Sequence, residues 1–222
     1  ENNYLGKGLM VDATVSASDE SLRGGLNISN PNYNYSGNLV YGGITSTNND
    51  KPDSGYENTI TNINAGTKFE QYEGIFFSPG FDLSFDDLRV DGTASEKLKK
   101  QAGEFTEFNF NYSLEMDKRD RTFMPTDGHF IRFSQGLPIY ADQASILNQF
   151  NVSKYYLFNE DLIGAFKLYG ASINGIDDDV RLSKRLHIPS RRLRGFEAKR
   201  VGPIDKNDYV GGNYAVAANI EA

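Results

Sequence analysis

Residues suited to catalysis are sparse in this sequence. Histidine occurs only at His129 and His187, and cysteine is absent. A serine–histidine–aspartate triad can be assembled from distant positions, but no nucleophile elbow supports one here. The segment "IDDDVRL" (176–182) carries carboxylates suited to a divalent cation, yet it lacks the glycine and distal glutamate of a calcium loop. We therefore predict no catalytic residue, no cofactor and no metal site, and we interpret 176–182 as a solvated loop.

A second chemical feature is the basic stretch "SRRLRGFEAKRVGP" (190–203), in a chain whose formal net charge is −7. Arginine and lysine are unusually dense between residues 181 and 200. The basic residues there are Arg181, Lys184, Arg185, Arg191, Arg192, Arg194, Lys199 and Arg200.

Three interpretations of this stretch are open. A nucleic-acid patch is disfavoured by the isoelectric point near 4.9 and by the lack of a recognisable binding module. A solvated loop touching anionic lipid headgroups is the second. In the third, the stretch folds into a polar interior, where arginines pair with inward-facing carboxylates and Gly195 allows a tight turn. Because an unpaired buried arginine is costly, the third interpretation requires an acidic partner on the wall.

Composition narrows the class of protein. The 222 residues suit one large all-β domain or one to two ordinary domains. No apolar run approaches the roughly 18 residues of a spanning helix, which excludes a helical membrane protein but leaves a membrane β-barrel open. The absence of cysteine rules out disulfides. With no signal peptide at Glu1 and no closing segment at Ala222, we expect a piece of a longer protein.

Period-two alternation dominates the chain. In "FNFNYSLEM" (108–116), phenylalanine, tyrosine, leucine and methionine alternate with asparagine, serine and glutamate. Successive side chains of a strand point to opposite faces, so this pattern predicts strands. We predict ten, separated by turn signals such as "NPNYNYSG" and "MPTDG". Their ranges are 8–18, 21–30, 37–47, 57–71, 75–86, 104–118, 128–138, 146–158, 162–174 and 211–222.

These strands are about twice the usual globular length, and one face is strongly polar. A soluble sandwich also alternates, but long strands, a polar second face and connections that alternate between short and long favour an antiparallel up-and-down barrel with lipid outside and water inside. The segment "TASEKLKKQAGE" (93–104) predicts a surface helix in a long loop. The longest connection, from about Ile176 to Val210, holds the basic stretch, and connections of that length are usually functional.

Four motifs resemble the BamA family of outer-membrane protein insertases. They are "NYLGKG" (3–8), "ISNPNY" (28–33), "DKRDRTFMPTDGHFIRFS" (117–134), and "PSRRLRGFEAKRVGP" followed by "VGGNYAVAANIEA". They occur in the family's order across nearly the whole chain. Each is weak by itself, and together they are specific. Leu193 stands where valine or isoleucine is commoner in the family, a mild departure.

The resemblance implies a 16-stranded outer-membrane barrel, of which residues 1–222 would supply about strands three to twelve, without the periplasmic POTRA domains and the closing strands. It also implies a function: inserting and folding β-barrel proteins in the bacterial outer membrane without catalytic chemistry. The implied partners are outer-membrane lipid, unfolded β-barrel clients and accessory lipoproteins bound through POTRA domains, and no nucleic acid.

The resemblance also assigns residues. Arg194 of the motif Leu193-Arg194-Gly195-Phe196 would face the barrel interior and pair with an acidic wall position that matches Glu221. Gly195 and Phe196 would shape the loop tip, with Phe196 packed beside the turn. The implied strand-entry and turn residues are Gly211, Gly212, Asn213, Pro125, Asp127 and Gly128.

Two other functions remain open at this point. A polypeptide-translocating barrel of the same superfamily, either a two-partner secretion transporter or an autotransporter assembly factor, shares the Arg-Gly-Phe/Tyr loop. A passive porin or a barrel enzyme belongs to a different class. A porin would conduct ions through an open interior, whereas we expect the long loop to fill much of it.

Overall fold

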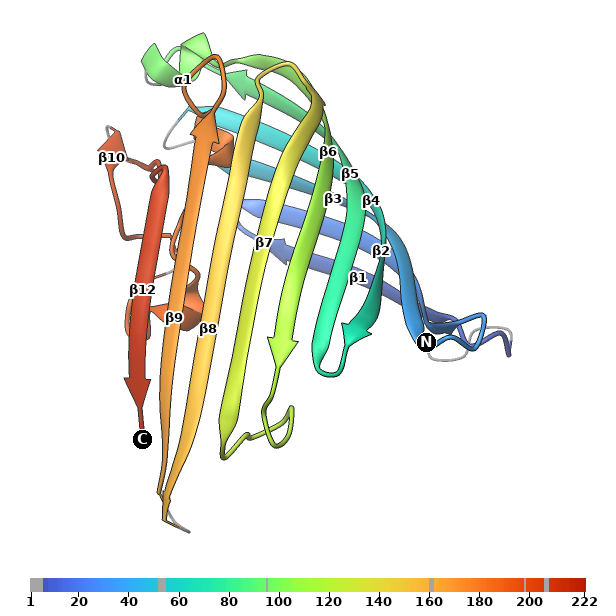
Figure 1. The fold of residues 1–222 in the computed structure, drawn as a ribbon. Helices are drawn as coiled ribbons and strands as arrows, with labels where there is room; N and C mark the ends of the chain where they lie inside the picture. Colours follow the sequence, from blue (N-terminus) through green and yellow to red (C-terminus); the bar gives the residue numbers. More distant parts are fainter. Residues whose placement is uncertain (1–5, 52–54, 95, 160–161, 198, 206–207) are drawn as a thin grey trace.

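A computed structural model describes residues 6–51, 55–94, 96–159, 162–197, 199–205 and 208–222. Ten strands form one antiparallel sheet, in which each strand pairs with its neighbours in sequence until β9, which pairs with β12 (Figure 1). The strands are β1 (Met10–Ser18), β2 (Ser21–Tyr33), β3 (Asn38–Lys51), β4 (Tyr56–Tyr72), β5 (Ile75–Val90), β6 (Gly103–Asp117), β7 (Gly128–Ala141), β8 (Ser145–Asn159), β9 (Leu162–Gly175) and β12 (Tyr214–Glu221).

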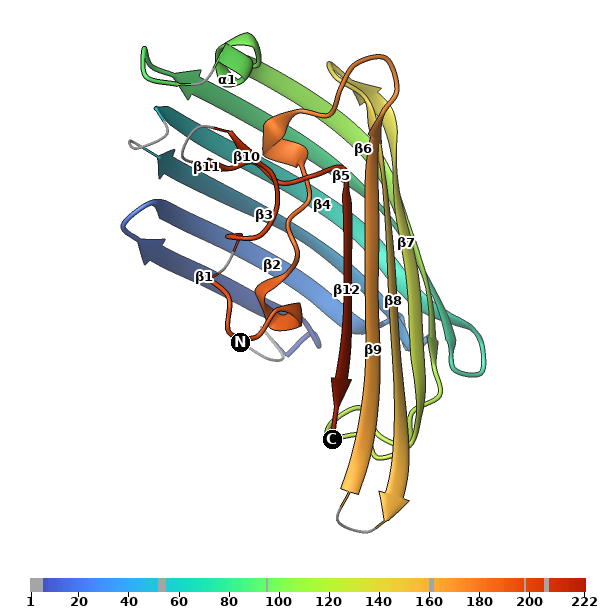
Figure 2. The same ribbon diagram turned by 90° about the vertical axis from the view of Figure 1, so that its left-hand side faces the viewer.

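The sheet is strongly curved, and its two edges are β1 and β12. Figure 2 shows the concave side, across which the connection from β9 to β12 runs. This connection, residues 176–213, is called the lumen loop below. It contains two short 3-10 helices, η2 (Leu182–Lys184) and η3 (Ser190–Arg192), and the small hairpin of β10 (Ile204–Asp205) and β11 (Asp208–Tyr209).

The polarity of the two faces of the sheet is the reverse of that in a soluble protein: the convex outer face is apolar and the concave inner face is polar. On β5, Phe81 and Phe85 are 49% and 43% exposed on the convex face, whereas Ser84 and Asp86 are 2% and 3% exposed on the concave face. Aromatic rings also meet side by side on the convex face, as where Phe81 stacks on Phe108 with ring centroids 5.7 Å apart. Apolar side chains outside and polar ones inside are the pattern of a membrane barrel, because lipid replaces water as the outer solvent.

The ten predicted strands are confirmed, with corrections to their ends. Several run further than the alternation indicates: β3 continues to Lys51 and β5 to Val90. The last strand begins at Tyr214 rather than residue 211, because Gly211 adopts a left-handed φ of 71° that a strand does not accommodate.

The predicted helix at 93–104 is shorter than expected and less exposed. Helix α1 spans only Glu96–Lys100. Before it, the Asp91 carboxylate accepts hydrogen bonds from the backbone N–H and hydroxyl of Thr93, which holds Thr93 in a turn. After it, β6 begins at Gly103. Leu98 is buried against Leu88, so α1 is part of a packed cluster rather than a free surface helix.

Two small apolar clusters lie between the wall and the lumen loop. One joins Tyr169, Ala171, Ala215 and Ala217 and receives Leu186 and Ile188 of the loop. The other joins Leu88, Ala94 and Leu98 and receives Leu182 of the loop. The loop is therefore packed against both sides of the concave face. No helix in the described part of the chain is both long enough and apolar enough to cross a membrane.

Candidate functional site

The lumen loop is the candidate functional site. It leaves β9 at the rim that carries α1, descends the concave face to η3, and returns to the start of β12 (Figure 2). Its return is fixed by an isolated bridge in which the backbones of Leu186 and Gly212 exchange hydrogen bonds of 2.8 and 2.9 Å. Residues 190–197, which contain η3 and the Leu-Arg-Gly-Phe motif, are called the loop tip.

Arg194 lies beside Glu221, its expected partner, with 3.3 Å between Nη2 and Oε1. The Arg194 side chain is nevertheless 77% exposed. Glu221 has a second cation, because Lys167 Nζ on β9 lies 2.6 Å from its other oxygen, Oε2. The Glu221 carboxylate therefore joins β9, β12 and the loop tip, with Lys167 as its closer and better shielded partner.

The rest of the Leu-Arg-Gly-Phe motif forms the turn. Gly195 has a φ of 83°, a left-handed conformation that glycine adopts without strain. Leu193 follows η3 and donates its N–H to the Ser190 carbonyl at 3.1 Å. Phe196 is 62% exposed, and neither apolar cluster of the described residues includes it, so its packing beside the turn stays a prediction.

Arg192 holds the tip to the wall more firmly than Arg194 does. Its guanidinium donates to Asn151 Oδ1 on β8 at 2.8 Å, and it lies over the Tyr169 ring of β9. Its carbonyl accepts a hydrogen bond from Asn219 Nδ2 on β12 at 3.0 Å. Three strands thus contact this one residue, which the sequence pattern did not single out.

The start of the loop holds the most buried charges of the site, which corrects the interpretation of 176–182 as a solvated loop: residues 176–179 are exposed, but Val180 and Arg181 are buried. Arg181 forms an ion pair with Asp86 of β5, and each side chain is 2% exposed. The Arg181 guanidinium also lies over the Phe105 ring, 3.8 Å from its centroid. Burial lowers the pKa of Arg181 to about 10, so the side chain still carries its charge at neutral pH.

Neighbouring contacts extend this attachment along β5 and β6. The Ser183 hydroxyl donates to Asp86 Oδ2 at 2.9 Å, and Lys184 Nζ lies 2.7 Å from Glu107 Oε2 on β6. The Leu182 N–H donates to the Gln101 side chain at 2.8 Å. Asp86 and Glu107 were not predicted as site residues, although both occupy inward positions of alternating strands. Their partners in the loop are far away in the sequence, so no spacing between residues could have indicated these pairs.

The strand-entry residues form a tight junction with the loop. At Gly211, a Cβ atom would lie 2.8 Å from the Leu186 carbonyl oxygen. Both this close approach and the left-handed φ of 71° therefore require glycine. Gly212 supplies the bridge to Leu186, and the Asn213 carbonyl accepts from the Ile173 N–H at 2.8 Å.

The predicted turn residues Pro125, Asp127 and Gly128 lie at the opposite rim, between β6 and β7 (Figure 1). There the Asp120 carboxylate accepts hydrogen bonds from the Thr126 hydroxyl and from the N–H groups of Thr126 and Asp127. These bonds, led by that of the Thr126 hydroxyl, lower the pKa of Asp120 to about 2. The structure does not bring this turn to the lumen loop.

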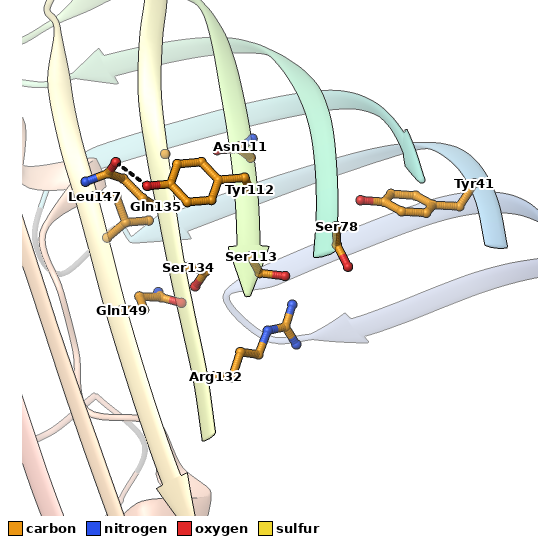
Figure 3. Close-up of a pocket in the computed structure, with 11 residues that line it drawn as sticks. Tyr41, Ser78, Asn111, Tyr112, Ser113, Arg132, Ser134, Gln135, Leu147 and Gln149 are labelled. Atoms are coloured by element: carbon orange, nitrogen blue, oxygen red, sulfur yellow. Dashed lines mark hydrogen bonds between the residues drawn. The ribbon is translucent and has the colours of Figure 1, made fainter. Parts of the chain in front are cut away.

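A separate hollow of about 240 Å³ opens on the wall between β3 and β8, with polar side chains such as Arg132 and Gln149 around it (Figure 3). At its edge the Tyr112 hydroxyl donates to Gln135 Oε1 at 2.9 Å. Among the described residues, no group of three or more His, Asp or Glu side chains is placed to hold a metal ion. His129 and His187 lie on different elements, β7 and the lumen loop.

Comparison with known proteins gives the family. The Omp85 superfamily domain matches residues 3–222. The outer membrane protein assembly factor BamA of Neorickettsia risticii (strain Illinois) is 25% identical over 183 residues, which cover 78% of this chain and 24% of the relative. The sorting and assembly machinery component 50 homolog A of Xenopus laevis is 23% identical over 124 residues, which cover 54% of this chain and 26% of the relative. The chain thus spans about a quarter of the length of these relatives.

The fold agrees with this assignment. The crystal structure of BamA from Haemophilus ducreyi lacking POTRA domains 1–3 superposes with a TM-score of 0.83 at 20% identity, covering 99% of this chain and 48% of that one. The inverted faces described above fit the same environment, because a BamA-type barrel stands in lipid. The chain belongs to the Omp85 superfamily, and its sheet is part of a BamA-type barrel of the bacterial outer membrane.

Proposed function

We propose that this chain is the central part of an assembly factor that inserts and folds β-barrel proteins in the outer membrane without covalent catalysis. The observation that carries the proposal is the lumen loop, whose Arg-Gly-Phe tip reaches Glu221 on the concave wall. The names of the two curated relatives, an assembly factor and a sorting and assembly component, support it.

In the proposed arrangement the ten strands are about strands three to twelve of a 16-stranded barrel. POTRA domains and the closing strands belong to the remainder of the protein. Clients pair with exposed strand edges at the seam of the barrel, where unpaired N–H and C=O groups template a new strand. Proposed partners are membrane lipid, unfolded β-barrel clients and accessory lipoproteins, and the proposal includes no nucleic acid.

The contribution of the residues described here is to hold the loop inside the barrel. An exposed ion pair such as Arg194–Glu221 stabilises a structure by only about 0–1 kcal/mol, so Arg194 can leave the wall at low cost while the Arg192 contacts with Asn151 and Asn219 hold η3 in place. Lys167 keeps the Glu221 carboxylate paired when Arg194 departs. This arrangement suits a loop tip that changes position while a client is handled.

The test is reconstitution of the full-length protein in liposomes, with assembly of an unfolded outer-membrane barrel followed by its heat-modifiable mobility in gels. Arg194→Ala should reduce the assembly rate severalfold while the variant barrel itself remains folded. The matched control is Lys99→Ala, which removes a cation from a solvent-facing ion pair on α1. Equal assembly by Arg194→Ala and the unmodified protein would refute the role of Arg194.

The same liposomes separate the other functions. A translocating barrel would export a secreted polypeptide and leave barrel clients unassembled. A porin would conduct ions continuously, whereas a filled interior predicts low and intermittent conductance. Either outcome, without client assembly, would overturn the proposed function.

A further inference from the structure

The lumen loop is attached to the wall at two places of very different character. At its start, Arg181 and Asp86 are both almost completely buried on the β5 side. At its tip, Arg194 is largely exposed and pairs with Glu221 on β12. Strands β6 to β9 separate β5 from β12 in the sheet order. The loop is therefore held by a deep, buried ion pair at its start and by a largely exposed ion pair at Arg194.

The deep attachment depends on the two charges balancing each other. Within the described part of the structure, Asp86 Oδ1 and Arg181 Nε and Nη1 are buried without a hydrogen-bond partner. Each charge is compensated by the other and by Ser183, which bonds to both side chains, and the Phe105 ring adds a contact to the Arg181 guanidinium. Removing one member would leave an uncompensated charge out of water, which is far more costly than removing both.

Apolar packing next to the ion pair reinforces the attachment. Val180, adjacent to Arg181 in the chain, is 2% exposed, and Leu182 packs on the cluster of Leu88, Ala94 and Leu98. Lys184 adds the pair with Glu107 on β6. Undocking residues 180–184 would have to expose this cluster and hydrate two ion pairs together, whereas breaking the Arg194–Glu221 contact frees only a largely exposed guanidinium.

We propose that Arg181 and Asp86 are positioning residues that clamp the start of the lumen loop to β5, so that movement of the loop during client assembly is confined to its tip. This rests on the proposed function for its link to assembly. The clamp itself is a property of the chain that can be measured without any client.

The clamp is tested in the full-length protein with a single thiol, since the present chain contains no cysteine; any cysteine elsewhere in the protein is first changed to serine. Val180→Cys places the thiol at a buried loop position, and Ile176→Cys, at a 54% exposed loop position, sets the labelling rate of an accessible thiol. Maleimide labelling of folded protein in detergent should be slow at position 180 and fast at position 176. Heat-modifiable mobility confirms that each variant is folded.

Three changes are then combined with Val180→Cys. Arg181→Ala should raise labelling about a hundredfold, the consequence of leaving a buried carboxylate unpaired. Asp86→Leu with Arg181→Met, which removes both charges at similar volume, should restore slow labelling. Arg194→Ala should speed tryptic cleavage in the loop tip and leave labelling at position 180 slow. If Arg181→Ala itself prevents folding, Asp86→Asn takes its place, because it leaves Arg181 as the unpaired buried charge at similar volume and should likewise speed labelling.

Two results would overturn the clamp: slow labelling in folded Arg181→Ala protein, or fast labelling in Arg194→Ala protein, which would mean that the loop moves as one body. The link to assembly is read from the liposome assay, where folded Arg181→Ala protein should be slow and the double variant restored. If the protein assembles no client at all, the proposed function fails while the labelling data still decide the clamp. If the unmodified protein assembles clients and Arg181→Ala does so equally well, the link is refuted.

Discussion

Lys167 holds the carboxylate of Glu221 at 2.6 Å, closer than Arg194 of the loop tip, whose nearest nitrogen lies at 3.3 Å. The negative charge of Glu221, which Arg194 contacts, is therefore already balanced by Lys167 on the barrel wall. An exposed arginine that pairs with an already neutralised carboxylate gains little free energy from the contact. This relationship makes the Arg194 contact easy to break, although the Arg192 contacts at the start of the tip do not depend on Glu221.

The two cations on Glu221 should differ in their effect on the tip. Glu221→Gln removes the partner of Arg194 and should increase tryptic cleavage between Arg191 and Arg200 by up to about fivefold, the limit set by an exposed ion pair. Lys167→Met leaves Arg194 as the only cation within bonding distance of Glu221 in the described structure and should leave cleavage unchanged or slower. Timed digestion of folded protein measures both. Faster cleavage in Lys167→Met would contradict this division of roles.

Gly211 and Gly212 provide a matched pair at the entry to β12. Gly211→Ala places a Cβ against the Leu186 carbonyl in a left-handed backbone and should lower the free energy of unfolding by about 2 kcal/mol. At Gly212 the nearest atom to a Cβ is 3.5 Å away, so Gly212→Ala should cost less than half as much. Urea titrations in detergent micelles compare the two. Equal losses would mean that the junction does not depend on the conformation of Gly211.

The Asp120 turn should make stability depend on pH in the acid range. Its pKa is lowered from 3.8 to about 2 in the folded protein, so the ionised carboxylate stabilises the turn above about pH 4. That stabilisation is lost as the pH falls toward 2, because the folded state must then take up the proton. The difference in urea midpoint between the unmodified protein and Asp120→Asn should accordingly shrink between pH 4 and pH 2.

The control for this turn is Thr126→Val, which removes the hydroxyl that contributes most to the shift. It should reproduce part of the Asp120→Asn effect at pH 7 and weaken its pH dependence. A midpoint difference that stays constant from pH 7 to pH 2 would show that the Asp120 carboxylate does not stabilise the turn.

The orientation of the sheet in lipid can be tested with one residue on each face of β6. Leu114 lies on the convex face between Phe77 and Phe133, and Asn111 lines the hollow on the concave face. Leu114→Arg should reduce stability in liposomes by about 2–4 kcal/mol, because it places a charge in the apolar band. Asn111→Arg, facing water, should cost under about 1 kcal/mol. Reversed magnitudes would reverse the assignment of the two faces.

Much of this architecture follows from local sequence patterns. Strict alternation, as in residues 108–116, sets which side chains share a face, because successive side chains of a strand point to opposite faces of the sheet. Strand order followed from that pattern as well, since short antiparallel connections make sequence neighbours into sheet neighbours. The loop motif was visible for the same reason: Arg194, Gly195 and Phe196 are adjacent in the chain.

What the tertiary structure decided concerns residues that are far apart in sequence. Asp86 is one inward carboxylate among many, and Arg181 is one of eight basic residues between residues 181 and 200; only the curvature of the sheet and the path of the loop bring these two together. The competition between Lys167 and Arg194 for Glu221 likewise depends on the register of β9 with β12. The sequence alone determined a two-faced barrel sheet with a basic loop. The tertiary structure decided which basic residues are buried against the wall and which stay exposed, because burial of a charge depends on the surrounding walls and not on its neighbours in the chain.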